Sequence, residues 1–93
     1  MARRARLLKT HPLFRTEALA LRGIADDFDG RLSRILEVIR QFPEQAVVDP
    51  EHGWSTYFGE QIGFPATIFY RFDELAVEAM SIRQFGANLR RRF

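Results

Sequence analysis

Hydrophobic residues recur along this chain of 93 residues with two different periods. Residues 31–42 show the clearest helical pattern, because apolar residues return every three or four positions while charged residues fall mostly on the other side. The apolar stripe consists of Leu32, Ile35, Leu36, Ile39 and Phe42. Pro43 follows directly. Since proline lacks the N–H that a helix requires, we expect the helix to end at Phe42.

A weaker helical pattern precedes this helix. Thr16 is a suitable N-cap residue, and Glu17 is favourable in the first turn of a helix. The apolar residues that follow at helical spacing are Ala18, Leu21, Ala25 and Phe28. The acidic and glycine-containing residues 26–30 would stop or kink this helix. We therefore expect two short helices that form a helical hairpin.

The second half of the chain favours strands. Residues 66–72, ATIFYRF, are rich in the β-branched and aromatic residues that strands prefer. In a regular strand, Ile68, Tyr70 and Phe72 point to one face, and Phe69 and Arg71 point to the other.

Residues 75–83, LAVEAMSIR, are expected to return as a second strand after a tight bend at Asp73-Glu74. Regular alternation would place Glu78, Met80 and Ile82 on one face. The other face would carry Val77, Ala79, Ser81 and Arg83. A helix is the competing interpretation, because LAVEAM has high helix propensity. We favour the strand, because residues 66–72 need a partner to form a stable sheet.

Two shorter segments complete the prediction. Residues 5–10 are expected to form a short N-terminal strand, which His11-Pro12 interrupts. Residues 54–58, WSTYF, are expected to form a strand between loops at 43–53 and 59–65. The expected fold is therefore α+β, with an N-terminal strand, a short helical hairpin and a mostly antiparallel three-strand meander. We expect residues 1–93 to form one domain.

Composition excludes several classes of site. The chain has no cysteine and two histidines, which excludes a disulfide framework and a thiolate metal site. We expect neither a metal nor a cofactor. No apolar run approaches the ~20 residues of a membrane span, and the apolar run near the start is too short for a signal peptide. We expect a cytoplasmic protein.

Charge is distributed unevenly, although the formal net charge is only +2. Residues 1–15 and 83–93 carry nine of the fourteen cations and no acid, whereas all twelve acids lie between these segments. Basic segments on a small domain indicate affinity for a polyanion. Solubility and salt bridges to the acidic middle are the alternative explanation.

The second half of the chain resembles the RelE/ParE toxin superfamily, which includes plasmid-stabilisation proteins. The resemblance is carried by Phe42-Pro43, by Ile68-Phe69-Tyr70-Arg71, by the acidic bend Asp73-Glu74 and by the strand from Val77 to Arg83. It covers residues 31–92 well and residues 5–28 loosely. The resemblance implies the toxin of a type II toxin–antitoxin system, which inhibits growth and is neutralised by a cognate antitoxin protein.

Two branches of that family differ in their targets, because one cleaves mRNA on the ribosome and the other poisons DNA gyrase. This chain departs from several nuclease members, which place His and Tyr near the C-terminus. Gln84 stands where a His often follows the last strand, and Phe93 cannot act as an acid or a base. The helical hairpin is also shorter than is usual in the family.

RNA cleavage without a metal requires a base, a cation beside the phosphate and an acid. The candidate cations are Arg71, Arg83, Arg90, Arg91 and Arg92. The weaker candidates, which could transfer protons, are His52, Tyr57 and Glu78. No acid–base pair is evident beside the arginines, so we leave catalytic residues unassigned. We favour a toxin that binds DNA gyrase, with a ribosome-dependent endoribonuclease and a non-toxic binding adaptor as alternatives.

Overall fold

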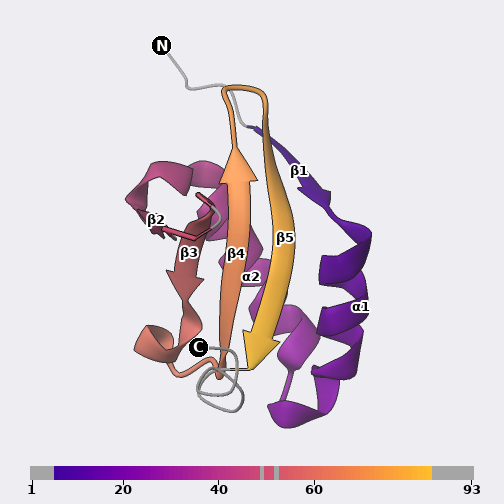
Figure 1. Cartoon of the computed structure of the whole chain (residues 1–93). Coiled ribbons are helices and arrows are strands. Elements are labelled where there is room, and N and C mark those ends of the chain that lie inside the picture. Colours follow the sequence, from indigo (N-terminus) through magenta and orange to yellow (C-terminus); the bar gives the residue numbers. More distant parts are fainter. Residues whose placement is uncertain (1–5, 49, 52, 85–93) are drawn as a thin grey trace.

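Helix α2 covers one face of a five-stranded sheet, and α1 lies beside the sheet next to β5 (Figure 1), in the computed structural model, which describes residues 6–48, 50, 51 and 53–84. In chain order, the elements are β1 (Leu7–Thr10), α1 (Pro12–Ala20), the 3-10 helix η1 (Arg22–Ile24), α2 (Phe28–Gln41), η2 (Pro43–Gln45), β2 (Val47–Val48), β3 (Ser55–Phe58), η3 (Gly59–Ile62), β4 (Ala66–Phe72) and β5 (Ala76–Gln84). The predicted α+β class and the helical hairpin are confirmed.

The sheet has the strand order β1-β5-β4-β3-β2. Neighbouring strands are antiparallel except β1, which runs parallel to β5. The prediction of a three-strand meander is therefore wrong about the size of the sheet. Two strands were not included in it: β1, which joins the far side of β5, and β2, which lies in a predicted loop. With only Val47 and Val48, β2 is too short to show any periodicity in the sequence.

The hairpin of β4 and β5 is the longest pairing in the sheet, and it excludes a helix at residues 75–83. The bend lies one position later than predicted. The Asp73 N–H donates to the Ala76 carbonyl over 2.9 Å, which leaves Glu74 and Leu75 at the tip. The Asp73 carboxylate accepts the N–H groups of Leu75 and Ala76 at 2.8 and 2.9 Å. These donors lower the pKa of Asp73.

A β-bulge changes which residues of β5 share a face. Phe69 pairs with Ser81, and Tyr70 pairs with Ala79, so Met80 is an extra residue without a partner in β4. The regular alternation predicted for β5 is therefore correct up to Ala79 and again from Ser81, but it reverses across Met80. Val77, Ala79 and Ile82 all face α2, whereas Glu78, Ser81 and Arg83 lie on the opposite side of the strand.

Helix α1 begins earlier than the sequence pattern predicted. His11, not Thr16, is its N-cap, and the Nδ1 atom of His11 accepts the Leu13 N–H over 3.1 Å. Pro12 occupies the first turn, where the missing N–H of proline has no cost. The same residue therefore ends the first strand and starts the helix. Phe28, which was assigned to the first helix, instead begins α2.

The core lies between α2 and the sheet. Leu32, Ile35 and Ile39 of α2 are buried, as predicted from the apolar stripe. On the sheet side the buried residues are Ala66, Ile68, Tyr70, Val77, Ala79 and Ile82. Phe42 does not belong to the core, because it is the C-cap residue, with φ −134°, and 45% of it is exposed.

One glutamate attaches α1 to the edge of the sheet. Strand β1 ends at Thr10 and leaves the following part of the β5 edge uncovered. There the Glu17 carboxylate accepts hydrogen bonds from the Ser81 hydroxyl at 2.7 Å and from the Ile82 N–H at 3.1 Å. Ser81 is fully buried. Glu17 therefore satisfies a strand edge that β1 is too short to cover.

We predict that Glu17→Ala lowers the free energy of unfolding by about 1–3 kcal/mol, because two buried donors lose their acceptor. Urea denaturation followed by circular dichroism measures this change. Glu74→Ala, at the exposed tip of the hairpin, is the matched control and should change the free energy by less than about 0.5 kcal/mol. Equal effects of the two substitutions would contradict the role of Glu17.

Candidate functional site

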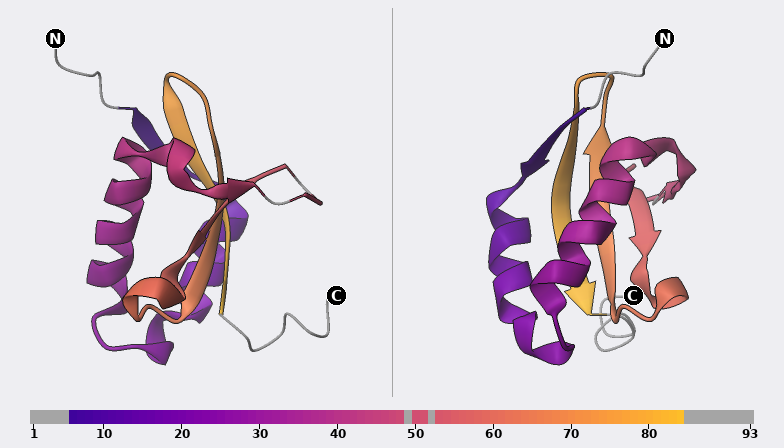
Figure 2. Two further views of the ribbon diagram at one scale, coloured as in Figure 1. Left: turned by 90° about the vertical axis from the view of Figure 1, so that its left-hand side faces the viewer. Right: turned by 180° about the vertical axis from the view of Figure 1, so that it is seen from behind.

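The face of the sheet that points away from α2 brings together the strand arginines selected from the sequence. We call this surface the open face; its residues include Lys9, Phe69, Arg71, Glu78 and Arg83. Figure 2 shows the sheet nearly edge-on in its left view, with α2 on the side opposite the open face. Glu78, which pairs with Arg71, lies five positions before Arg83 in β5, and the extra residue Met80 places these two residues on the same face. Arg71 and Arg83 therefore both lie on the open face.

Arg71 is held in a cross-strand ion pair. Its Nε and Nη2 atoms lie 3.0 and 2.8 Å from one oxygen of Glu78, the residue directly opposite in β5. The Arg71 side chain is still 61% exposed, whereas that of Glu78 is 26% exposed. The carboxylate therefore orients the guanidinium and leaves most of it accessible to a ligand.

Arg83 is oriented by an aromatic ring. Its guanidinium carbon lies 5.6 Å from the centroid of Phe69, within the range of a cation–π interaction. The buried Nε atom of Arg83 has no hydrogen-bond partner among the described residues. Phe69 lies between the two arginines along the hairpin, because its partner Ser81 separates Glu78 from Arg83 in β5.

Of the weaker candidates within the described residues, Tyr57 does not join this site and Glu78 does. Tyr57 pairs with Ile68 and therefore lies on the helix face, opposite Arg71. Glu78 lies beside Arg71 on the open face. His52 and Arg90–Arg92 lie outside the described residues.

Tyr70 is also on the helix face, as its alternation with Arg71 predicted. Its hydroxyl is buried and donates to the Pro43 carbonyl over 2.7 Å. Burial, together with the nearby Glu44 charge, raises the pKa of Tyr70 to about 12. This hydroxyl anchors the start of η2 and is not placed to exchange protons with a ligand on the open face.

The described part of the open face therefore offers cations and one carboxylate, without a histidine or a tyrosine. No group of three or more His, Asp or Glu side chains within the described ranges is placed to hold a metal ion. None of the helices in these ranges is both long and apolar enough to cross a membrane. This set of groups suits the binding of an anion better than proton transfer.

Comparison with known proteins found no matching family model, curated protein or solved structure. The resemblance to the RelE/ParE superfamily therefore stays a prediction.

Sequence reasoning missed a second surface, on the helix face. Tyr57 was selected for proton transfer, but it lies in a hollow between α2 and β3 that is also lined by Val38 and Phe42. One sequence signal was available. Arg31, Arg34 and Val38 form a second row at helical spacing beside the apolar stripe of α2, next to its members Ile35 and Phe42.

The position of Tyr70 predicts a difference in alkaline stability. Its folded pKa of about 12 exceeds the ordinary value of 10, so its contribution to stability is present below pH 10 and is lost as the pH rises towards 12. The free energy of unfolding of the wild type should therefore fall more steeply in this window than that of Tyr70→Phe. Denaturant titrations at several alkaline pH values measure both slopes.

Absorbance of tyrosinate gives an independent reading of the same prediction. The chain has two tyrosines, so Tyr57→Phe leaves only Tyr70, which should titrate late. Tyr70→Phe should remove the late phase. A late phase that persists in Tyr70→Phe would contradict the assignment.

Proposed function

We propose that this protein is the toxin of a type II toxin–antitoxin pair and acts in the cytoplasm by binding a large anionic target through the open face. The supporting observation is the placement of Arg71 and Arg83 on one face, on either side of Phe69. Among large anionic targets, we favour DNA gyrase bound to DNA. The cognate antitoxin is the expected partner.

The separation of the two arginines favours an extended target. Arg83 pairs with Thr67, which lies four residues before Arg71 in β4. Four residues of strand span roughly 13 Å. Arginines whose backbone positions are this far apart, each held by its own neighbour, Glu78 or Phe69, can contact separate anionic groups along a polymer. The stabilisation of one reacting phosphate would require the two guanidinium groups to converge.

The groups that could transfer protons favour binding over cleavage. Both tyrosines lie on the helix face, and Glu78 is already engaged by Arg71. Cleavage of RNA would require Glu78, or a residue outside the described ranges, to act as a base beside Arg71. A ribosome-dependent endoribonuclease is therefore the second candidate, and Glu78 is the residue on which it depends.

We predict that expression of the wild-type chain without a partner arrests bacterial growth and that the double substitution Arg71→Ala/Arg83→Ala relieves the arrest. Removal of both cations should reduce toxicity by at least about tenfold in colony counts, because two charge-assisted contacts are lost. Immunoblotting at equal induction would show that the variant accumulates to the wild-type level.

Arg22→Ala/Arg34→Ala is the matched control for this experiment. Both residues are exposed arginines on the helical side, paired with Asp29 and Asp27, and their loss removes the same charge. The control should remain toxic. Normal growth with the wild-type chain would overturn the toxin proposal and favour the adaptor, and equal relief by the control would show a non-specific effect of charge.

The type of damage separates the two target classes. DNA damage and filamentation indicate gyrase, whereas rapid loss of translation with cut mRNA indicates the endoribonuclease. In the second case Glu78→Gln, which keeps the shape of the side chain, should abolish cleavage. Retention of cut mRNA in Glu78→Gln would exclude Glu78 as the base.

A further inference from the structure

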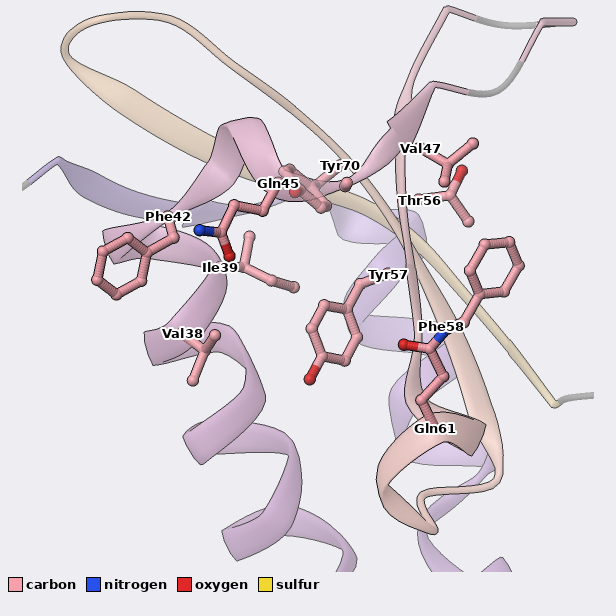
Figure 3. Close-up of a pocket in the computed structure, with 11 residues that line it drawn as sticks. Val38, Ile39, Phe42, Gln45, Val47, Thr56, Tyr57, Phe58, Gln61 and Tyr70 are labelled. Atoms are coloured by element: carbon pink, nitrogen blue, oxygen red, sulfur yellow. The ribbon is translucent and has the colours of Figure 1, made fainter.

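A groove runs along α2 on the helix face of the sheet. It consists of two adjoining hollows of about 260 and 270 Å³, both of which are lined by Val38 and Tyr57. Figure 3 shows the Tyr57 ring between α2 and β3, with Val38 across from it and Phe42 farther along the helix. We call this surface the α2 groove.

The floor of the α2 groove is apolar and accessible. Val38 is 48% exposed, Phe42 is 45% exposed and Ile62 of η3 is 59% exposed. Helix α2 crosses over β5 and β4, α1 lies beside β5, and β3 lies on the other side of β4 (Figure 2, right). A two-layer α/β domain buries such a sheet edge when a further helix lies beside the existing ones. The groove therefore has the form of a position for one more helix.

The charges around the α2 groove select the chemistry of that helix. Arg31 and Arg34 line the hollow near η3, and no Asp or Glu is among the described residues that line either hollow. Arg31 is fixed by a hydrogen bond of 2.7 Å to the Gly63 carbonyl, and the Arg34 side chain is 70% exposed. A helix with carboxylates at this end would gain favourable interactions with both arginines.

We propose that the α2 groove binds an amphipathic, acidic helix from another protein chain. Its apolar stripe would cover Val38 and Tyr57, and its carboxylates would face Arg31 and Arg34. Other occupants fit less well in charge. Residues 1–5 and 85–93 of this chain carry Arg3, Arg4 and Arg90–Arg92 without an acid.

A second copy of the chain is also a poor occupant. Its longest helix, α2, carries three arginines and two acids and would bring positive charge to Arg31 and Arg34. Helix α1 has one arginine and one glutamate, and that glutamate is engaged by Ser81. Neither helix supplies the carboxylates that the groove would attract.

The α2 groove lies on the opposite face from Arg71 and Arg83, so this inference does not depend on toxicity. The helix could belong to the antitoxin if the proposed function is correct. If expression of the chain is harmless, the binding of an acidic helix can still be tested and can still succeed.

A displayed library of single-helix peptides tests the proposal with a defined probe. Each peptide has the length of α2, 14 residues, with every position open to all helix-forming residues. Selection on the purified full-length chain should enrich sequences with apolar residues every three or four positions and with Glu or Asp beside that stripe. Enrichment of basic or uncharged sequences, or of none, would overturn the proposal.

Variants locate the bound peptide. Val38→Glu should weaken binding of an enriched peptide by at least about tenfold, because it places a carboxylate in the apolar floor. Leu19→Glu, at a residue of α1 that is 67% exposed, is the matched control and should bind like the wild type. Unchanged binding by Val38→Glu would place the peptide elsewhere and overturn the proposal.

Charge reversal and self-association complete the experiment. Arg34→Glu should weaken the binding of acidic peptides by several-fold, whereas Arg22→Glu should leave it unchanged. This difference separates a role of Arg34 in the groove from a general effect of charge. Sedimentation of the wild-type chain over a range of concentrations should show a monomer. A dimer that Val38→Glu dissociates would identify a second copy as the occupant and overturn the proposal.

Discussion

The pairing of β4 with β5 is the constraint on which the rest of the structure depends. One face of this hairpin is covered by α2, so its register is fixed by which residues must be buried. Ile68 and Tyr70 in β4 face the core, and Val77, Ala79 and Ile82 in β5 meet them. A shift by one residue would expose these side chains and bury Arg71 and Glu78.

The Met80 bulge makes this pairing compatible with the surface chemistry of β5. Glu78 and Arg83 are five positions apart, so a regular strand would place them on opposite faces. The extra residue lets Ile82 return to the core while Arg83 joins Glu78 and Arg71 on the open face. The cationic surface is therefore a consequence of how the core is packed, since the bulge serves both faces at once.

The sequence predicted the elements with strong periodicity and missed those determined by tertiary contacts. The stripe of α2 and the alternation of β4 correspond to buried faces, which is why 66–72 matched the observed strand. The start of α1 was missed, because Pro12 breaks a strand and also suits the first turn of a helix. The bulge was missed because LAVEAMSIR alternates without a glycine or any other local signal at Met80. In the site, Arg71 lies on the face that the alternation of β4 predicted. Glu78 was grouped with Ile82, which lies on the other face, because the bulge at Met80 was not predicted.

The two faces of β3 explain why the open face and the α2 groove are separable. Tyr57 points into the groove, while its neighbours Thr56 and Phe58, which border the same hollow, pair with Phe69 and Thr67 of the open face. A helix in the groove would pack against α2 and Tyr57 and would leave Arg71 and Arg83 uncovered. A partner that covered both surfaces would have to pass the edge of the sheet at β2, where Val47 and Val48 are 64% and 59% exposed. Since β2 consists of two residues, which pair with Ser55 and Thr56, the sheet is narrow at this edge and separates the two surfaces by a short distance along the chain of a partner.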